Sequence, residues 1–147
     1  MKKILFTLVI FSVYTISFAQ TKDAIAVKQV LKEYQNKIEK LDTTGISNLF
    51  GKNSSIFEGG SSEGTIAHYL EHHLGPELKE FSSFKFNNYK VDVQVDSNYA
   101  FANEVYSYII VTEKNKTEVK RNGVATSVLK KVGGMWKITN THSSSRK

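Results

Sequence analysis

The sequence predicts an α+β fold, because two different patterns of apolar residues divide it near Ser82. Before that point, apolar residues recur every three or four positions, which is typical of amphipathic helices. After it, they alternate with polar residues, which is typical of strands with one buried face. The chain has 147 residues, 40% of them hydrophobic, with one Pro and no Cys. This composition indicates a globular domain and excludes a disulfide scaffold, a zinc finger and an iron–sulfur site.

The first 19 residues have the pattern of a secretory signal peptide. Lys2 and Lys3 precede an apolar run over residues 4–18, which ends in Ser17-Phe18-Ala19. That run is shorter than the roughly 20 residues that a membrane-spanning helix needs. We therefore expect cleavage after Ala19 and export to the periplasm or the medium. Residues 20–147 would then form a single domain with no membrane span.

The charge of the remaining chain is mildly basic. Without Lys2 and Lys3, the formal net charge falls from +6 to +4. The basic residues are scattered among acidic ones and form no stripe interleaved with aromatic residues, as a nucleic-acid interface would require. We therefore expect no nucleic-acid partner.

Helices are expected first along the chain. Residues 22–42 carry one apolar stripe with helical spacing, and Thr21 or Asp23 is the expected N-cap. Residues 43–50 have the length and composition for a short second helix. Both helices precede the segments with strand periodicity, so we expect them to pack against a sheet formed later in the chain.

A third helix is expected over residues 63–74. Ser61-Ser62 would cap its start, and Gly75 in a left-handed conformation before Pro76 would end it. At 100° per residue, His73 falls on the apolar side of this helix. His73 is therefore predicted to point toward the sheet.

Strands follow, separated by short turns. Residues 54–58 are typical of a short strand that Gly59-Gly60 closes. Beyond Ser82 the period of two predicts four more strands in an antiparallel meander. Their expected ranges are 84–96, 99–112, 117–132 and 135–145.

Tight turns between these strands predict the register, and the register decides which side chains share a face. Counting outward from the turns places Glu104 opposite Ala125, and His142 beside Ala125 on the other side. Gly123 and Ala125 are small, so the polar side chains around them would leave a hollow. The polar side chains expected there are Tyr89, Glu104, Tyr106, Tyr108, Arg121, Asn140 and His142.

Several segments resemble the nuclear-transport-factor-2-like superfamily, and within it the small exported SnoaL-like branch. They are the long first helix, Phe57-Glu58-Gly59-Gly60, His73-Leu74-Gly75-Pro76 and Gly133-Gly134-Met135-Trp136. The resemblance covers essentially all of residues 20–147. It implies a cone, in which a strongly curved antiparallel sheet wraps around the N-terminal helices and leaves a pocket on its concave face. Related folds hold ketosteroid isomerases, scytalone dehydratase, limonene epoxide hydrolase and polyketide cyclases, besides members that only bind or assemble.

We interpret the chain as an exported protein that binds a small organic molecule in a partly polar pocket. Aromatic rings with a polar tip would suit a planar ligand. Arg121 and Arg146 would either be solvated at the strand edges, which is the more common case, or lie at the rim and favour a carboxylate or phosphate on the ligand. The expected pocket residues are His73, Tyr89, Tyr106, Tyr108, Arg121, Trp136, Asn140 and His142.

Catalysis is an alternative function. His142, Glu104 and Glu58 have the groups that a cofactor-independent isomerase, dehydratase or hydrolase needs for acid–base chemistry. The same three residues would equally serve as a buried polar network that holds the end of the sheet together. No organic cofactor is expected. A divalent metal ion, if one is bound, would take His73, His142 and Glu58.

Assembly is the third function considered. The outer face of the predicted sheet is more apolar than a solvated surface. Its apolar residues are Phe101, Val105, Ile109, Val111, Val124 and Val128. The resemblance implies that such a face is covered by a second copy, so we expect a homodimer.

Overall fold

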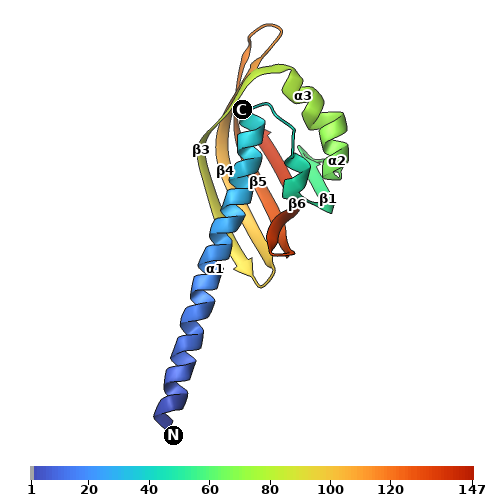
Figure 1. Ribbon diagram of the computed structural model, residues 1–147. Coiled ribbons are helices and arrows are strands. Elements are labelled where there is room, and N and C mark those ends of the chain that lie inside the picture. The colour runs from blue at the N-terminus through green and yellow to red at the C-terminus, as the bar shows by residue number, and fades with distance from the viewer. Residues whose placement is uncertain (1) are drawn as a thin grey trace.

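The computed structural model describes the backbone of residues 2–147 and the side chains of residues 21–147 (Figure 1). Helical elements come first and long strands come last, as the two apolar patterns predict. The elements in chain order are α1 (Lys2–Glu39), η1 (Ile46–Leu49), β1 (Phe50–Glu58), β2 (Ser61–Gly64), α2 (Ile66–Tyr69), η2 (Leu70–Leu74), α3 (Gly75–Lys79), β3 (Phe81–Asp96), β4 (Tyr99–Thr112), β5 (Glu118–Val132) and β6 (Met135–Arg146).

The strands form a single curved sheet in the order β2-β1-β6-β5-β4-β3. All neighbours pair antiparallel except β1 and β6, which run parallel. The sheet curves around the C-terminal half of α1, and the α2–α3 segment lies beside β1 (Figure 1). The predicted α+β cone is therefore confirmed, with a mixed sheet in place of the purely antiparallel one.

Helix α1 holds the sheet through a buried stripe and one polar anchor. Val27, Leu31 and Ile38 are buried against the sheet. The Asp23 carboxylate accepts hydrogen bonds from Lys131 Nζ at 2.6 Å and from Trp136 Nε1 at 3.1 Å. The prediction that Thr21 or Asp23 caps this helix is wrong, because α1 already runs through both positions. Asp23 instead ties the helix to the β5–β6 hairpin.

The signal-peptide prediction concerns residues 1–19, whose side chains lie outside the described residues. Cleavage after Ala19 and export therefore stay predictions. Within residues 21–147, no helix is both long enough and apolar enough to cross a membrane.

The third helix begins later and continues further than the sequence predicts. Ser61-Ser62 lies in β2, and Thr65 is the N-cap, whose hydroxyl accepts from the backbone N–H of His68 at 3.4 Å. Gly75 is right-handed, with φ −65° and ψ −48°, and its N–H bonds the carbonyl of Leu70 five residues earlier. A Cβ on Gly75 would lie 2.2 Å from that carbonyl oxygen. Gly75 therefore permits a wide helical turn and does not end the helix.

The predicted register is correct between β4 and β5 and wrong in the second half of β6. Glu104 lies opposite Ala125, as predicted. Between β5 and β6, Leu129 pairs with Ile138, but Val128 pairs with Asn140 and leaves an extra residue in β6. The Thr139 hydroxyl donates to the Val128 carbonyl at 3.1 Å and stabilises this bulge. The side chains of β6 after the bulge therefore lie on the face of the sheet opposite to the one that the predicted register assigns them.

The core fills one end of the cone. Its most deeply buried side chains come from α1, η1, β5 and β6. They are Val27, Leu31, Ile46, Leu129 and Ile138. This is the apolar end that the strand pattern predicts, and the opposite end of the concave face carries polar groups.

Candidate functional site

A cavity of about 290 Å³ occupies the polar end of the concave face. Residues of α1, β1, α2, η2, α3 and the strands β3 to β6 line it. Aromatic lining residues are Tyr34, Tyr69, Phe81, Phe84, Phe86, Tyr106 and Tyr108. Polar lining residues are Gln35, Glu58, Glu77, Glu104, Ser127, Thr141, Ser143, Ser144 and Ser145.

The aromatic wall of the cavity is held by ring-to-ring contacts. The ring of Phe84 stacks on that of Tyr108 with centroids 5.2 Å apart, and Phe86 meets Tyr106 edge to face at 5.2 Å. Such pairs are the preferred geometries of aromatic rings. A Cβ on Gly123 would lie 2.3 Å from the Tyr106 ring, so this ring fills the space above Gly123. The predicted hollow therefore lies over Ala125, which lines the cavity.

Glu104 is the most deeply buried carboxyl of the cavity, with 7% of its surface exposed. Its Oε2 accepts a hydrogen bond from the Tyr89 hydroxyl at 2.9 Å, and its Oε1 accepts one from the Ser127 hydroxyl at 3.3 Å. The hydroxyls of Ser127 and Thr141 lie 3.1 Å apart and extend this network to β6. Burial raises the pKa of the Glu104 carboxyl, although both hydrogen bonds act in the opposite direction.

Replacing Glu104 with Gln should flatten the pH dependence of stability. Because the pKa of Glu104 is higher in the folded protein than in the unfolded chain, the folded protein retains this proton to higher pH. The free energy of unfolding therefore falls as pH rises from the unfolded-state pKa through the folded-state pKa. Urea unfolding at pH 5 and pH 8 measures this fall, which should be smaller in Glu104→Gln.

The exposed residue Glu33 supplies the control for this comparison. The Glu33→Gln variant should keep the pH dependence of the unaltered protein. If Glu104→Gln retains that dependence as well, Glu104 is not the group that titrates.

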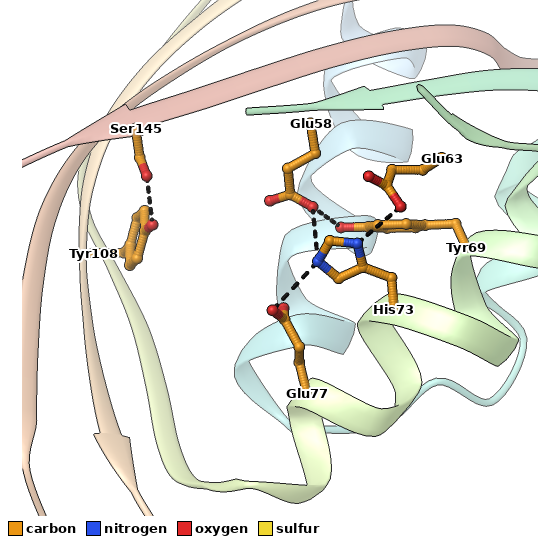
Figure 2. Close-up of polar contacts among 7 residues, drawn as sticks. All are labelled: Glu58, Glu63, Tyr69, His73, Glu77, Tyr108 and Ser145. Atoms are coloured by element: carbon orange, nitrogen blue, oxygen red, sulfur yellow. Dashed lines mark hydrogen bonds and ion pairs between the residues drawn. The ribbon is translucent and has the colours of Figure 1, made fainter. Parts of the chain in front are cut away.

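A second acidic cluster surrounds His73 on the α2–α3 side of the cavity (Figure 2). The Tyr69 hydroxyl donates to Glu58 Oε2 at 2.5 Å. His73 Nδ1 lies 2.9 Å from Glu63 Oε2, and His73 Nε2 lies 3.3 Å from Glu77 Oε1 and 3.8 Å from Glu58 Oε2. His73 therefore links the two lining carboxylates Glu58 and Glu77 to the carboxylate of Glu63.

Hydrogen bonds, neighbouring charges and burial together shift the pKa values of His73 and Glu77 in this cluster. The bond to Glu63 raises the pKa of His73, and the negative charges of Glu77 and Glu58 act in the same direction against the effect of burial. Burial raises the pKa of the Glu77 carboxyl, while His73 lowers it. The imidazole thus offsets part of the negative charge around it.

The net electrostatic character of the cavity is acidic. Three carboxyl groups line it, and none of the lining residues that the structure describes is Lys or Arg. Arg121 does not line the cavity and donates to the carbonyl of its neighbour Lys120 at 3.1 Å. Arg146 is exposed at the end of β6. Neither arginine therefore lines the cavity, and Arg121 lies beside the lining residue Tyr108 on the neighbouring strand.

Six of the predicted site residues lie in or against the cavity. Glu58, Glu104, Tyr106 and Tyr108 line it, and the Tyr108 hydroxyl donates to Ser145 at 2.9 Å (Figure 2). His73 and Tyr89 do not line it but bond to carboxyl groups that do.

Four predicted site residues lie elsewhere. Besides Arg121, Trp136 is buried at the core end, where it donates to Asp23. The bulge in β6 turns Asn140 and His142 onto the outer face, where they pair with Val128 and Thr126. The His142 ring there meets Phe57 edge to face, with ring centroids 6.4 Å apart.

The predicted acid–base set and the predicted metal set both contain His142, and the structure assembles neither of them. His142 lies on the face of the sheet opposite to Glu58 and Glu104, so it cannot complete the acid–base set with them. For the same reason, the metal set of His73, His142 and Glu58 does not form. Among residues 21–147, no other group of His, Asp or Glu has a metal-binding arrangement.

Sequence reasoning missed several lining residues, above all Gln35. Leu31, Gln35 and Ile38 follow one another on the buried stripe of α1, and Gln35 is 3% exposed. A polar residue within an apolar helical stripe could have indicated that Gln35 lines a cavity. Thr141 was missed for a different reason, because the bulge exchanges it for His142.

Comparison with known proteins agrees with this architecture. The family model described as a SnoaL-like domain matches residues 27–146. No curated protein matches the chain significantly. Among solved structures, a nuclear transport factor 2 (NTF2-like) superfamily protein from Salmonella enterica superposes with a TM-score of 0.78 at 20% identity, covering 86% of this chain and 93% of that one.

Two further solved structures have the same fold. A conserved protein from Planctomyces limnophilus gives a TM-score of 0.76 at 12% identity, covering 86% of this chain and 98% of that one. A ketosteroid isomerase-like protein from Erwinia carotovora atroseptica gives a TM-score of 0.73 at 12% identity, covering 85% and 97%. At these identities the likeness concerns the fold.

Proposed function

Because the chain belongs to the SnoaL-like domain family, we propose that it binds a small, uncharged, ring-containing organic molecule in the cavity described above. The observation that carries this proposal is the lining itself. Aromatic rings form the wall, and the ionisable acidic and basic side chains among the described lining residues are all carboxyls. A volume of about 290 Å³ is at the lower end of ligand pockets, which suits a compound of two fused rings.

The lining favours an uncharged ligand over an anion. An anion would enter a cavity that already holds Glu58, Glu77 and Glu104, and no lining Lys or Arg among the described residues would neutralise it. Like charges brought together in a low-dielectric site repel strongly. A flat apolar ring would instead bury its faces against Phe84, Phe86 and Tyr106.

Two ring compounds that differ in charge test this proposal. We expect 2-naphthol, which is neutral at pH 7, to bind at least about tenfold more tightly than naphthalene-2-sulfonate, a difference of about 1.4 kcal/mol. Isothermal titration calorimetry at pH 7 measures both affinities. Equal affinities, or tighter binding of the sulfonate, would contradict the acidic, aromatic character proposed for the site.

A second candidate function is proton transfer at such a ligand. It is favoured by the position of two carboxyl groups, Glu58 and Glu104, in one aromatic cavity, each with a tyrosine hydroxyl as hydrogen-bond partner. The test follows deuterium exchange at C1 of 2-tetralone in D₂O by NMR. Exchange faster than in buffer, and lost in Glu58→Gln, would support catalysis, whereas exchange at the buffer rate would leave binding as the function.

We propose a homodimer from the apolar residues that the outer face of the sheet exposes. Phe101, Val105 and Val124 are 48%, 55% and 50% exposed there, side by side on β4 and β5. An apolar patch of this kind marks an interaction surface in soluble proteins. Sedimentation equilibrium of residues 20–147 tests the proposal, and a monomer mass at micromolar concentration would rule it out.

Export is proposed from the sequence of residues 1–19 alone. The mature chain would begin at Gln20 and act in the periplasm or the medium. N-terminal sequencing of the protein recovered from its own cells tests this. A chain that still begins at Met1 would contradict it.

A further inference from the structure

Gln35 is the one side chain among residues 21–147 whose polar atoms are fully buried and have no hydrogen-bond partner. Both its Oε1 and its Nε2 are unpartnered. Each such atom costs on the order of the desolvation free energy of an amide, because water no longer solvates it. Neither atom therefore contributes to holding the described fold together.

The position of Gln35 in the fold indicates why a residue with this desolvation cost could be present. It lies on the buried stripe of α1 between Leu31 and Ile38, where an apolar residue would pack without any unmet polar atom. It also lines the cavity. The other buried carboxyl and hydroxyl groups there, on Glu104, Ser127 and Thr141, bond to one another or to Tyr89. The hydrogen-bonding capacity of the Gln35 amide is thus available to a molecule bound in the cavity.

We infer that Gln35 recognises a ring compound that carries a hydrogen-bond donor and an acceptor side by side, as in a lactam or cyclic imide. The carboxamide presents one acceptor oxygen and one donor nitrogen next to each other. A ring –NH–C(=O)– group matches both at once and is uncharged. This inference rests on the proposed function, since it specifies which uncharged ring compounds the cavity selects.

The test compares two probes that differ by one methyl group. 2-Quinolinone has the adjacent N–H and C=O, whereas N-methyl-2-quinolinone lacks the donor and keeps the ring and the carbonyl. We expect the protein to bind 2-quinolinone at least about tenfold more tightly, and the Gln35→Leu variant to bind both probes equally. Fluorescence titration measures the four affinities.

A stability measurement and a matched variant accompany the titration. Gln35→Leu removes two unmet polar atoms, so the ligand-free variant should melt about 3 °C higher or more. The control is Gln29→Leu, on the exposed side of the same helix. It should leave both the probe preference and the melting temperature unchanged. A melting temperature lowered by Gln35→Leu alone would mean that Gln35 supports the fold, and the inference would be wrong.

The outcomes separate this inference from the proposed function. If 2-naphthol binds but the two quinolinones bind equally to the unaltered protein, recognition by Gln35 is refuted and the binding function stands. The same conclusion follows if Gln35→Leu keeps the preference. If 2-naphthol and both quinolinones all fail to bind, the proposed function itself is refuted.

Discussion

Replacing Gly75 with Ala is expected to destabilise the protein by about 2–4 kcal/mol. Glycine to alanine within a helix ordinarily stabilises by up to about 1 kcal/mol, so the expected sign is reversed here. The reason is that the new Cβ would lie 2.2 Å from the Leu70 carbonyl oxygen, a backbone atom that cannot move without opening the turn. Urea unfolding at pH 7 measures the change.

The wide turn that Gly75 permits also positions two side chains beside the cavity. It lies between His73 and Glu77, whose side chains meet at 3.3 Å beside the cavity. We therefore expect Gly75→Ala to weaken binding of 2-naphthol as well. Gly51→Ala in β1 is the matched control, because the nearest atom to its added Cβ is a side-chain methyl at 3.4 Å. Equal stabilities of the two variants would show that the close approach at Gly75 is tolerated.

Replacing Ala125 with Phe is expected to reduce the affinity for 2-naphthol at least about 100-fold, or about 2.7 kcal/mol. Ala125 lies on the cavity wall opposite Glu104, and its side chain is a single methyl group. A phenyl ring there would occupy the volume that the ligand needs. Calorimetric titration measures the loss.

The neighbouring residue supplies the control for this change. Val124 precedes Ala125 on β5 but points to the outer face, where it is 50% exposed. Val124→Phe adds a ring of the same kind without reaching the cavity and should retain the affinity. Full affinity in a folded Ala125→Phe variant would mean that the ligand binds elsewhere.

The order and type of the long elements could be predicted because their patterns are repetitive. In β4 and β5 the alternation is continuous, and short turns set the register, so the pairing of Glu104 with Ala125 and of Tyr106 with Gly123 followed from the sequence. This register placed two tyrosines and one carboxyl of the cavity correctly. A pattern that repeats over many residues tolerates a local exception.

The failures lie where a single residue decides the geometry. Residues 139–141 are all polar, so no alternation indicates which of them is the extra one, and the bulge moved His142 to the outer face. Gly75 before Pro76 is typical of a helix end, whereas the right-handed backbone of Gly75 and its hydrogen bond to Leu70 show that the helix continues. The unpartnered state of Gln35 depends on every surrounding side chain, which a local pattern does not contain.

The strand order carries a consequence for how the protein folds. Strand β6 lies between β1 and β5, so β1 and β2 have no place in the main sheet until β6 has been synthesised. The parallel pairing of Ile56 with Thr141 closes a loop of more than eighty residues, whose entropy must be lost before the contact forms. Such non-local pairing slows folding. The cone therefore closes only once its last strand, β6, is available to pair with both β1 and β5.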